Sequence, residues 1–165
     1  MSPERDFLKA AEWRSLVEAE QELARRRAEL NQLPSRADFM AKALSSSSAW
    51  DRAAALEFLR LFPEDVPKLL FLLVDLSLSA GWMLPAREAI RAARKGIDPS
   101  RFERVALECL SDGEVEDYLR LADMLAEVEA WDALGAVVDE AAKSGDSGIR
   151  EFSRTFTEKY GDMLP

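Results

Sequence analysis

The chain has 165 residues, of which 48% are hydrophobic and 32% charged, and its formal charge is −9 with one cysteine and no histidine. These values argue against a disordered, collagen-like or disulfide-linked protein, and the length suits one domain. Histidine is the commonest acid–base group and metal ligand near neutral pH, so its absence excludes Ser-His-Asp and Cys-His catalysis and histidine-bearing zinc sites.

Residue usage predicts an all-α protein. Ala, Leu, Glu, Lys and Arg together account for 88 residues, whereas Val, Ile and Thr account for only 13. The first group favours helices and the second favours strands. In chain order we expect helices over 3–12, 13–31, 36–45, 49–62, 64–79, 83–95, 99–110, 114–129, 131–143 and 148–160. The first two are open to being one continuous helix, which makes about nine, and the short connections predict that sequential helices pack antiparallel.

Capping residues mark the starts of several of these helices. The Ser2–Pro3 pair opens the first helix, and Asp98–Pro99 opens a later one. A serine followed three residues later by an acid predicts a capping box, and such pairs occur at Ser35 and Asp38, Ser48 and Asp51, and Ser111 and Glu114.

The helix expected over 64–79 begins the most apolar part of the chain. The apolar run between Lys68 and Arg87 is interrupted by Asp75, Gly81 and Pro85. A membrane-spanning helix needs about 20 apolar residues, so a membrane hairpin is disfavoured. We expect instead a helix that is buried on nearly all sides, either central in the domain or at a homodimer seam.

The helix over 83–95 carries a basic stripe. Its basic residues are Arg87, Arg91, Arg94 and Lys95. On a helix these share one face, while the opposite face is taken by Ala86, Ala89, Ile90 and Ala93. Two interpretations are open: a contact for an acidic partner or for nucleic-acid phosphate, or a face that pairs with acids on neighbouring helices. The second is favoured.

Cys109 is the single cysteine, on the helix expected over 99–110. The residues that share its face are Phe102, Val105, Ala106 and Leu110. No neighbouring base would activate a thiol there, so a buried, unreactive cysteine is predicted.

All of the net charge lies in residues 111–140. This segment has ten acids and a single base, Arg120, whereas the rest of the chain has equal numbers of acids and bases. The acids are Asp112, Glu114, Glu116, Asp117, Asp123, Glu127, Glu129, Asp132, Asp139 and Glu140. The order of ligands in a calcium-binding loop is not reproduced, so no metal is expected. Such a segment would repel phosphate, which makes nucleic acid an unlikely partner.

Four tryptophans, at positions 13, 50, 82 and 131, reveal an internal repeat. Residues 69–92 and 118–141 align without a gap, with apolar residues at helical spacing followed by Trp82 or Trp131 at the start of a second helix. A weaker copy contains Trp50. A helical hairpin cannot bury its own apolar face, so the copies should stack, with the tryptophans as wedges between helices rather than as a recognition surface.

Parts of the chain resemble two families of helical repeats. One hairpin resembles the tetratricopeptide family through Tyr118, Leu121, Ala122, Leu125, Trp131, Leu134, Val138 and Ala141. The 34-residue period of that family is broken, because the tryptophans are unevenly spaced. Residues 142–152 are similar to the turn of a HEAT repeat, with Asp146 before an aliphatic–arginine pair. The resemblance implies a single-domain, α-solenoid-like stack of antiparallel helical hairpins over residues 1–165, with a curved protein-binding surface.

The predicted function is a cytoplasmic protein–protein interaction module, an adaptor or scaffold without chemistry of its own and without a cofactor. The alternative is an acidic inhibitor or immunity protein that neutralises a basic toxin, nuclease or nucleic-acid-binding protein. A small enzyme that uses carboxylates and arginines is the third hypothesis. We expect a partner with a basic surface, no membrane contact, and a homodimer as an open possibility. The candidate partner-binding residues are Asp112, Glu116, Asp117, Asp123, Glu127, Arg87, Arg91 and Arg94.

Overall fold

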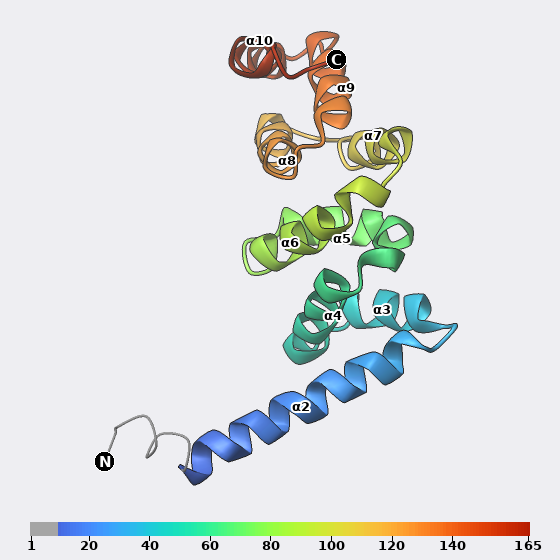
Figure 1. Cartoon of the computed structure of the whole chain (residues 1–165). Coiled ribbons are helices and arrows are strands. Elements are labelled where there is room, and N and C mark those ends of the chain that lie inside the picture. The colour runs from blue at the N-terminus through green and yellow to red at the C-terminus, as the bar shows by residue number, and fades with distance from the viewer. Residues whose placement is uncertain (1–9) are drawn as a thin grey trace. The chain divides into compact units, whose positions relative to one another are not determined.

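The computed structural model describes residues 10–165, which form nine α-helices and two 3₁₀ helices, with no strand in that range (Figure 1). The prediction of an all-α protein with about nine helices is confirmed. The elements are α2 (Ala11–Asn31), α3 (Arg36–Leu44), α4 (Ala49–Leu61), η1 (Pro63–Leu69), α5 (Leu70–Ser77), α6 (Met83–Ala93), η2 (Arg94–Gly96), α7 (Pro99–Glu108), α8 (Val115–Glu127), α9 (Trp131–Ala142) and α10 (Ser147–Tyr160).

The chain falls into two compact units. The first ends at Phe39, and the second is Met40–Pro165. Among the described residues, every buried hydrophobic side chain belongs to the second unit, and α2 contains no buried residue. The single domain over residues 1–165 stays a prediction. The Ser2–Pro3 cap and most of the helix expected over 3–12 lie outside the described residues.

Two predicted caps are present. The Ser48 hydroxyl accepts a hydrogen bond from the backbone N–H of Asp51 at 3.2 Å, which opens α4. The Ser48 N–H donates to the Ser46 hydroxyl at 3.0 Å and not to Asp51, so only one half of the predicted capping box forms. The Asp98 carboxylate accepts one from the N–H of Arg101 at 3.1 Å, with Pro99 in the first turn of α7. Each cap satisfies a backbone donor that has no partner within its own helix.

The capping box predicted at Ser111 is wrong. The N-cap of α8 is Glu114, three residues later, and the Glu114 N–H donates to the Asp117 carboxylate at 2.9 Å. Two acids with the same spacing replace the serine–acid pair, and negative charge is favourable at a helix N-terminus.

The apolar helix predicted over 64–79 is divided in two. Residues 63–69 form η1, and the α-helix α5 begins only at Leu70. Pro67 lacks a backbone donor and disfavours α geometry at the preceding residue, which explains the break. Leu73 is fully buried, but Phe71 on the other side is 49% exposed, so the expectation of burial on nearly all sides is wrong for one face.

Helices in Met40–Pro165 pack on their neighbours and on the helix after next. Helix α6 lies against α4 and α5, whereas α9 lies against α7, α8 and α10. Helix α5 also contacts α7, and α8 contacts α10. Sequential packing therefore holds for α5–α6, α8–α9 and α9–α10, whereas the main helical neighbour of α7 is α9. A solenoid repeat stays a prediction.

In the two aligned hairpins, equivalent positions are buried in the first helices, but burial differs at some equivalent positions of the second helices. In the first helices the buried equivalents are Leu69, Leu73 and Leu76 in one copy and Tyr118, Ala122 and Leu125 in the other. In the second helices Leu134 and Ala141 are buried, whereas their equivalents, Pro85 and Ala92, are exposed. The two second helices also have different neighbours, since α9 packs on α7, α8 and α10, whereas α6 packs on α4, α5 and η1.

The tryptophans do not share one environment. Trp82 and Trp131 are half-buried, and Trp131 packs against the Tyr160 ring with centroids 5.9 Å apart. Trp50, however, is 86% exposed, so the expectation that it forms a wedge between helices is wrong.

Candidate functional site

The basic stripe of α6 points at the C-terminal end of α8. As predicted, Ala86, Ala89, Ile90 and Ala93 form the buried face of α6. Arg87 donates a hydrogen bond to the Glu127 carboxylate, and Arg91 donates to the same carboxylate at 3.1 Å and to the Glu127 backbone oxygen at 3.2 Å. These contacts confirm the interpretation that the stripe pairs with an acid on another helix.

Helix α8 ends in a strained turn at Glu129. Its φ is 58°, and it is the only non-glycine residue with positive φ in the described part of the chain. The Ala130 N–H donates to the Leu125 oxygen at 2.8 Å and the Glu129 N–H to the Ala126 oxygen at 3.1 Å, which defines a Schellman motif. This motif places at Glu129 a conformation that costs a side-chain-bearing residue about 1–2 kcal/mol.

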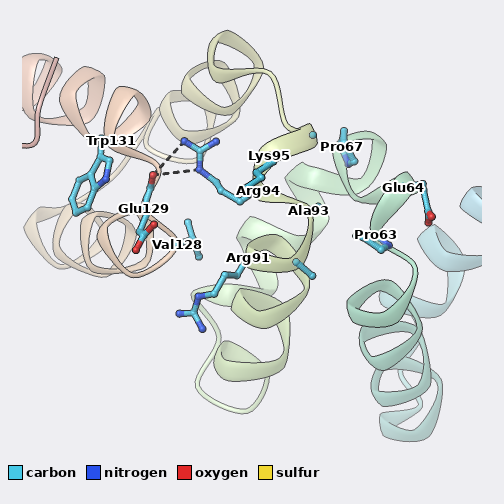
Figure 2. Close-up of a pocket in the computed structure, with 12 residues that line it drawn as sticks. Pro63, Glu64, Pro67, Arg91, Ala93, Arg94, Lys95, Val128, Glu129 and Trp131 are labelled. Atoms are coloured by element: carbon cyan, nitrogen blue, oxygen red, sulfur yellow. Dashed lines mark hydrogen bonds between the residues drawn. The ribbon is translucent and has the colours of Figure 1, made fainter.

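A third arginine supports that turn. The Nε and Nη2 atoms of Arg94 donate to the Glu129 backbone oxygen at 3.3 and 3.2 Å (Figure 2). We call Arg87, Arg91 and Arg94, with their acceptors on Glu127 and Glu129, the arginine clamp. Cations are favourable at the negative end of a helix, so the clamp stabilises α8 where its carbonyl groups lack partners within the helix.

The clamp sets the charge state of Glu127. Hydrogen bonding to Arg87, and to a smaller extent to Arg91, lowers the pKa of the Glu127 carboxyl below its ordinary value. Arg87 itself is only 7% exposed, and its Nε has no hydrogen-bond partner. Arg87 is therefore buried within the chain rather than on its surface, and a role for it in partner binding stays a prediction. Glu127, Arg91 and Arg94 are already engaged within the chain, and a role for them in partner binding stays a prediction.

A groove of about 820 Å³ lies beside the clamp (Figure 2). Pro63 and Pro67 of η1 form one part of its wall, and the half-buried Trp131 forms another. Charges of both signs line it: Arg91, Arg94, Lys95, Glu64 and Glu129. Both charge signs are present, and Arg91 and Arg94 already donate hydrogen bonds to Glu127 and Glu129. The lining of this groove therefore does not indicate whether a ligand would be acidic or basic.

The remaining acids predicted for partner binding occupy different environments. Asp112 and Asp123 are exposed and form no ion pair in the described structure. Glu116 pairs with Arg120 at 3.3 Å, one turn along the same helix, and Asp117 is used in the cap of α8. The structure does not bring these four side chains together into one pocket.

A second groove, of about 450 Å³, collects three other acids. Glu103 of α7 and Asp132 and Asp139 of α9 line it, and no basic residue does. None of the three forms an ion pair within residues 10–165. We call this feature the acidic groove. Gly135 on its wall lets Pro165 pack closely, because a Cβ at this position would lie 3.0 Å from Cδ of Pro165.

Sequence reasoning missed the acidic groove because its walls come from separate segments. Asp132 and Asp139 are seven residues apart, which puts them on one face of α9, and this spacing was visible. Glu103 lies in a segment of basic bias and joins them only because α7 packs on α9.

No similar protein was found. The chain matches no family model, no curated protein and no solved structure. The resemblance to tetratricopeptide and HEAT repeats therefore stays a prediction.

Within residues 10–165, no group of three acidic or cysteine side chains is arranged to hold a metal ion. None of the helices in that range combines the length and the apolar content of a membrane span. Cys109 is half-buried, and burial, with smaller contributions from Asp75 and Glu108, raises its pKa to about 11. The prediction of an unreactive thiol agrees with this environment.

Proposed function

We propose that this chain is a protein-interaction module that binds a basic segment of a partner protein in the acidic groove. The observation that carries the proposal is the groove itself: Glu103, Asp132 and Asp139 line one concave site without any cation. Carboxylates that lack an internal partner are available to the lysine or arginine side chains of another protein. This role needs no chemistry by the chain and suits a cytoplasmic adaptor or scaffold.

The surrounding charge supports the same ligand. Residues 111–140 carry all of the net charge of −9, and the arginine clamp neutralises only the Glu127 end of that segment. Asp112 and Asp123 are exposed acids outside the groove. Such a field accelerates association with a basic partner and is screened by salt. The groove then supplies direct contacts, and the wider surface supplies long-range attraction.

The direct test is the binding of fluorescently labelled arginine-rich, lysine-rich and acidic peptides, followed by anisotropy. We expect the two basic peptides to bind and the acidic peptide not to bind. The double variant Asp132→Asn with Asp139→Asn should weaken binding by about tenfold or more, since two charge-assisted contacts are lost. Failure of both basic peptides to bind would overturn the proposal.

A matched variant distinguishes direct contacts in the groove from the long-range electrostatic attraction of the whole acidic surface. Asp112→Asn with Asp123→Asn removes the same charge from sites outside the groove, and it should weaken binding by less than about threefold, through long-range attraction only. An equal loss of peptide affinity in the two double variants would show that the groove carboxylates do not contact the peptide directly.

Capture from the source lysate at low and high salt would then identify the partner. An adaptor should leave the activity of its partner intact. The alternative, an inhibitor or immunity protein, predicts one tightly held basic enzyme whose activity falls when this chain is added.

A further inference from the structure

Helix α2 has an apolar face that nothing within its own unit covers. The helix is 21 residues long and has no buried residue. Leu16 and Leu23 are 52% and 40% exposed, and Leu30 follows at the same seven-residue interval. We call these three residues the leucine stripe. In proteins most of the stability of a helix comes from tertiary packing of its apolar face, so an uncovered stripe indicates a partner surface.

The charges that flank the leucine stripe differ between its two sides. On one side, Arg26 follows Leu23 by three residues and pairs with Glu22 at 2.8 Å and with Glu29 at 3.1 Å. On the other side, Glu20 follows Leu16 by four residues and Arg27 follows Leu23 by four, so both lie beside the leucines. Neither Glu20 nor Arg27 forms an ion pair in the described structure. Two opposite charges on an apolar face are therefore left without partners.

We propose that α2 is a self-association helix, which pairs antiparallel with α2 of a second copy of this chain. In a parallel pair each residue lies near its own equivalent, so Glu20 would approach Glu20 and Arg27 would approach Arg27. An antiparallel pair exchanges the two ends of the helix, and each Glu20 then approaches Arg27 of the second copy. Two-fold symmetry forms this contact twice.

The overall charge of α2 favours the same orientation. Residues 12–22 contain four glutamates and one arginine, whereas residues 25–29 contain three arginines and one glutamate. Antiparallel pairing places the acidic half of each helix beside the basic half of the other, which attracts a second copy and disfavours the parallel alternative. At a rise of 1.5 Å per residue, the helix is about 31 Å long. Such a short seam supports a reversible dimer.

The test is sedimentation velocity of the full chain over a wide range of concentration. We expect a reversible monomer–dimer equilibrium. The double variant Leu16→Glu with Leu23→Glu should be monomeric throughout. A control, Ser15→Glu with Gln21→Glu, adds the same charge to α2 away from the stripe and should still dimerise. A wild-type chain that stays monomeric at all concentrations, or a dimer that persists in the leucine variant, would overturn the proposal.

Charge reversal tests the orientation. In the antiparallel pair, Glu20→Arg brings two arginines together twice, so the dimerisation constant should weaken by about tenfold. Adding Arg27→Glu to the same chain should restore wild-type dimerisation. In a parallel pair, residue 20 faces residue 20 and residue 27 faces residue 27, so like charges meet at both positions with or without Glu20→Arg. A dimerisation constant that Glu20→Arg leaves unchanged would therefore reject the antiparallel arrangement. Circular dichroism of each variant checks that the core of Met40–Pro165 stays folded. Binding of basic peptides to the acidic groove is measured separately, so either proposal can fail without the other.

Discussion

The guanidinium group of Arg94 donates two hydrogen bonds to the backbone oxygen of Glu129, the residue at which α8 turns out of its helix with φ of 58°. The donor and the acceptor are 35 residues apart in the sequence. The contact therefore compensates, from a distant helix, for a local conformation that glutamate disfavours.

Arg94→Met should destabilise the fold. It keeps much of the aliphatic side chain but removes both hydrogen bonds to the Glu129 oxygen, and we expect a loss of about 1–2 kcal/mol in the free energy of unfolding. Urea denaturation measures it. Lys95→Met is the matched control, since Lys95 is exposed and forms no ion pair, and it should change stability by less than about 0.5 kcal/mol. Equal stabilities for the two variants would contradict a supporting role for Arg94.

Glu129→Gly should stabilise the protein. Glycine adopts positive φ without the steric cost of a side chain, while the backbone oxygen that Arg94 binds is kept. After allowance for the greater freedom of glycine in the unfolded chain, a gain of about 0.5–1 kcal/mol is expected. Thermal or urea unfolding checks it, with Glu129→Ala as a control that keeps the strain. A glycine variant no more stable than the alanine variant would argue against strain at this position.

Glu127→Gln should cost stability in a manner that depends on pH. The folded-state pKa of Glu127 is lowered, chiefly by Arg87, so its stabilising contribution is present above the unfolded value of about 4.3 and is lost as the pH falls through the folded value. We therefore expect wild type to exceed the variant in unfolding free energy at pH 7, by about 1–2 kcal/mol, and the gap to shrink in acid. Glu140→Gln, which alters a more exposed carboxylate, should produce little change at either pH. A gap that widened in acid would be inconsistent with the clamp.

Cys109 should react slowly with thiol reagents. A pKa of about 11 leaves little thiolate at pH 8, so native labelling should be on the order of 10²-fold slower than that of an exposed cysteine with a pKa of about 8.5. The rate is followed with a chromogenic disulfide, in the native state and again in denaturant, where it should reach that of a free thiol. Fast native labelling would show that the thiol is more accessible than its half-buried position indicates.

Leu73→Asp should be among the most damaging single changes. Leu73 on α5 is fully buried, and the variant would place a charge without a partner in the core. A loss of several kcal/mol is expected, which calorimetry or urea denaturation would detect. Phe71→Asp, two residues earlier on the exposed side of α5, should be far milder. Similar losses at the two positions would mean that both faces of α5 are covered.

Helix positions could be predicted from the sequence because their signals are local. Asp98 caps α7 through its own neighbours, and the spacing of apolar residues placed α9 within a residue of its observed end. The error at residues 64–79 was also local: Pro67 carried the signal for a break, but the apolar content of the segment outweighed it in the prediction.

The candidate site depended on tertiary contacts that periodicity does not encode. The basic stripe on α6 was visible, and pairing with acids on another helix was the favoured interpretation, but the choice of Glu127 as the acceptor required α6 and α8 to be placed together. Glu103 meets Asp132 and Asp139 for a similar reason, because α7 packs on α9 rather than on its sequence neighbour α8.

The arginine clamp also bears on how the second unit unfolds. Helical hairpins that touch only near neighbours open from their ends, one after another, because each contributes its own small share of stability. Arg87, Arg91 and Arg94 bind acceptors 35 to 40 residues further along the chain, across the whole of α7. The α5–α6 hairpin and the α8–α9 turn are thereby coupled, and neither can open without losing the clamp. We therefore expect these three side chains, on α6 and at the start of η2, to make the loss of structure in this part of the chain cooperative.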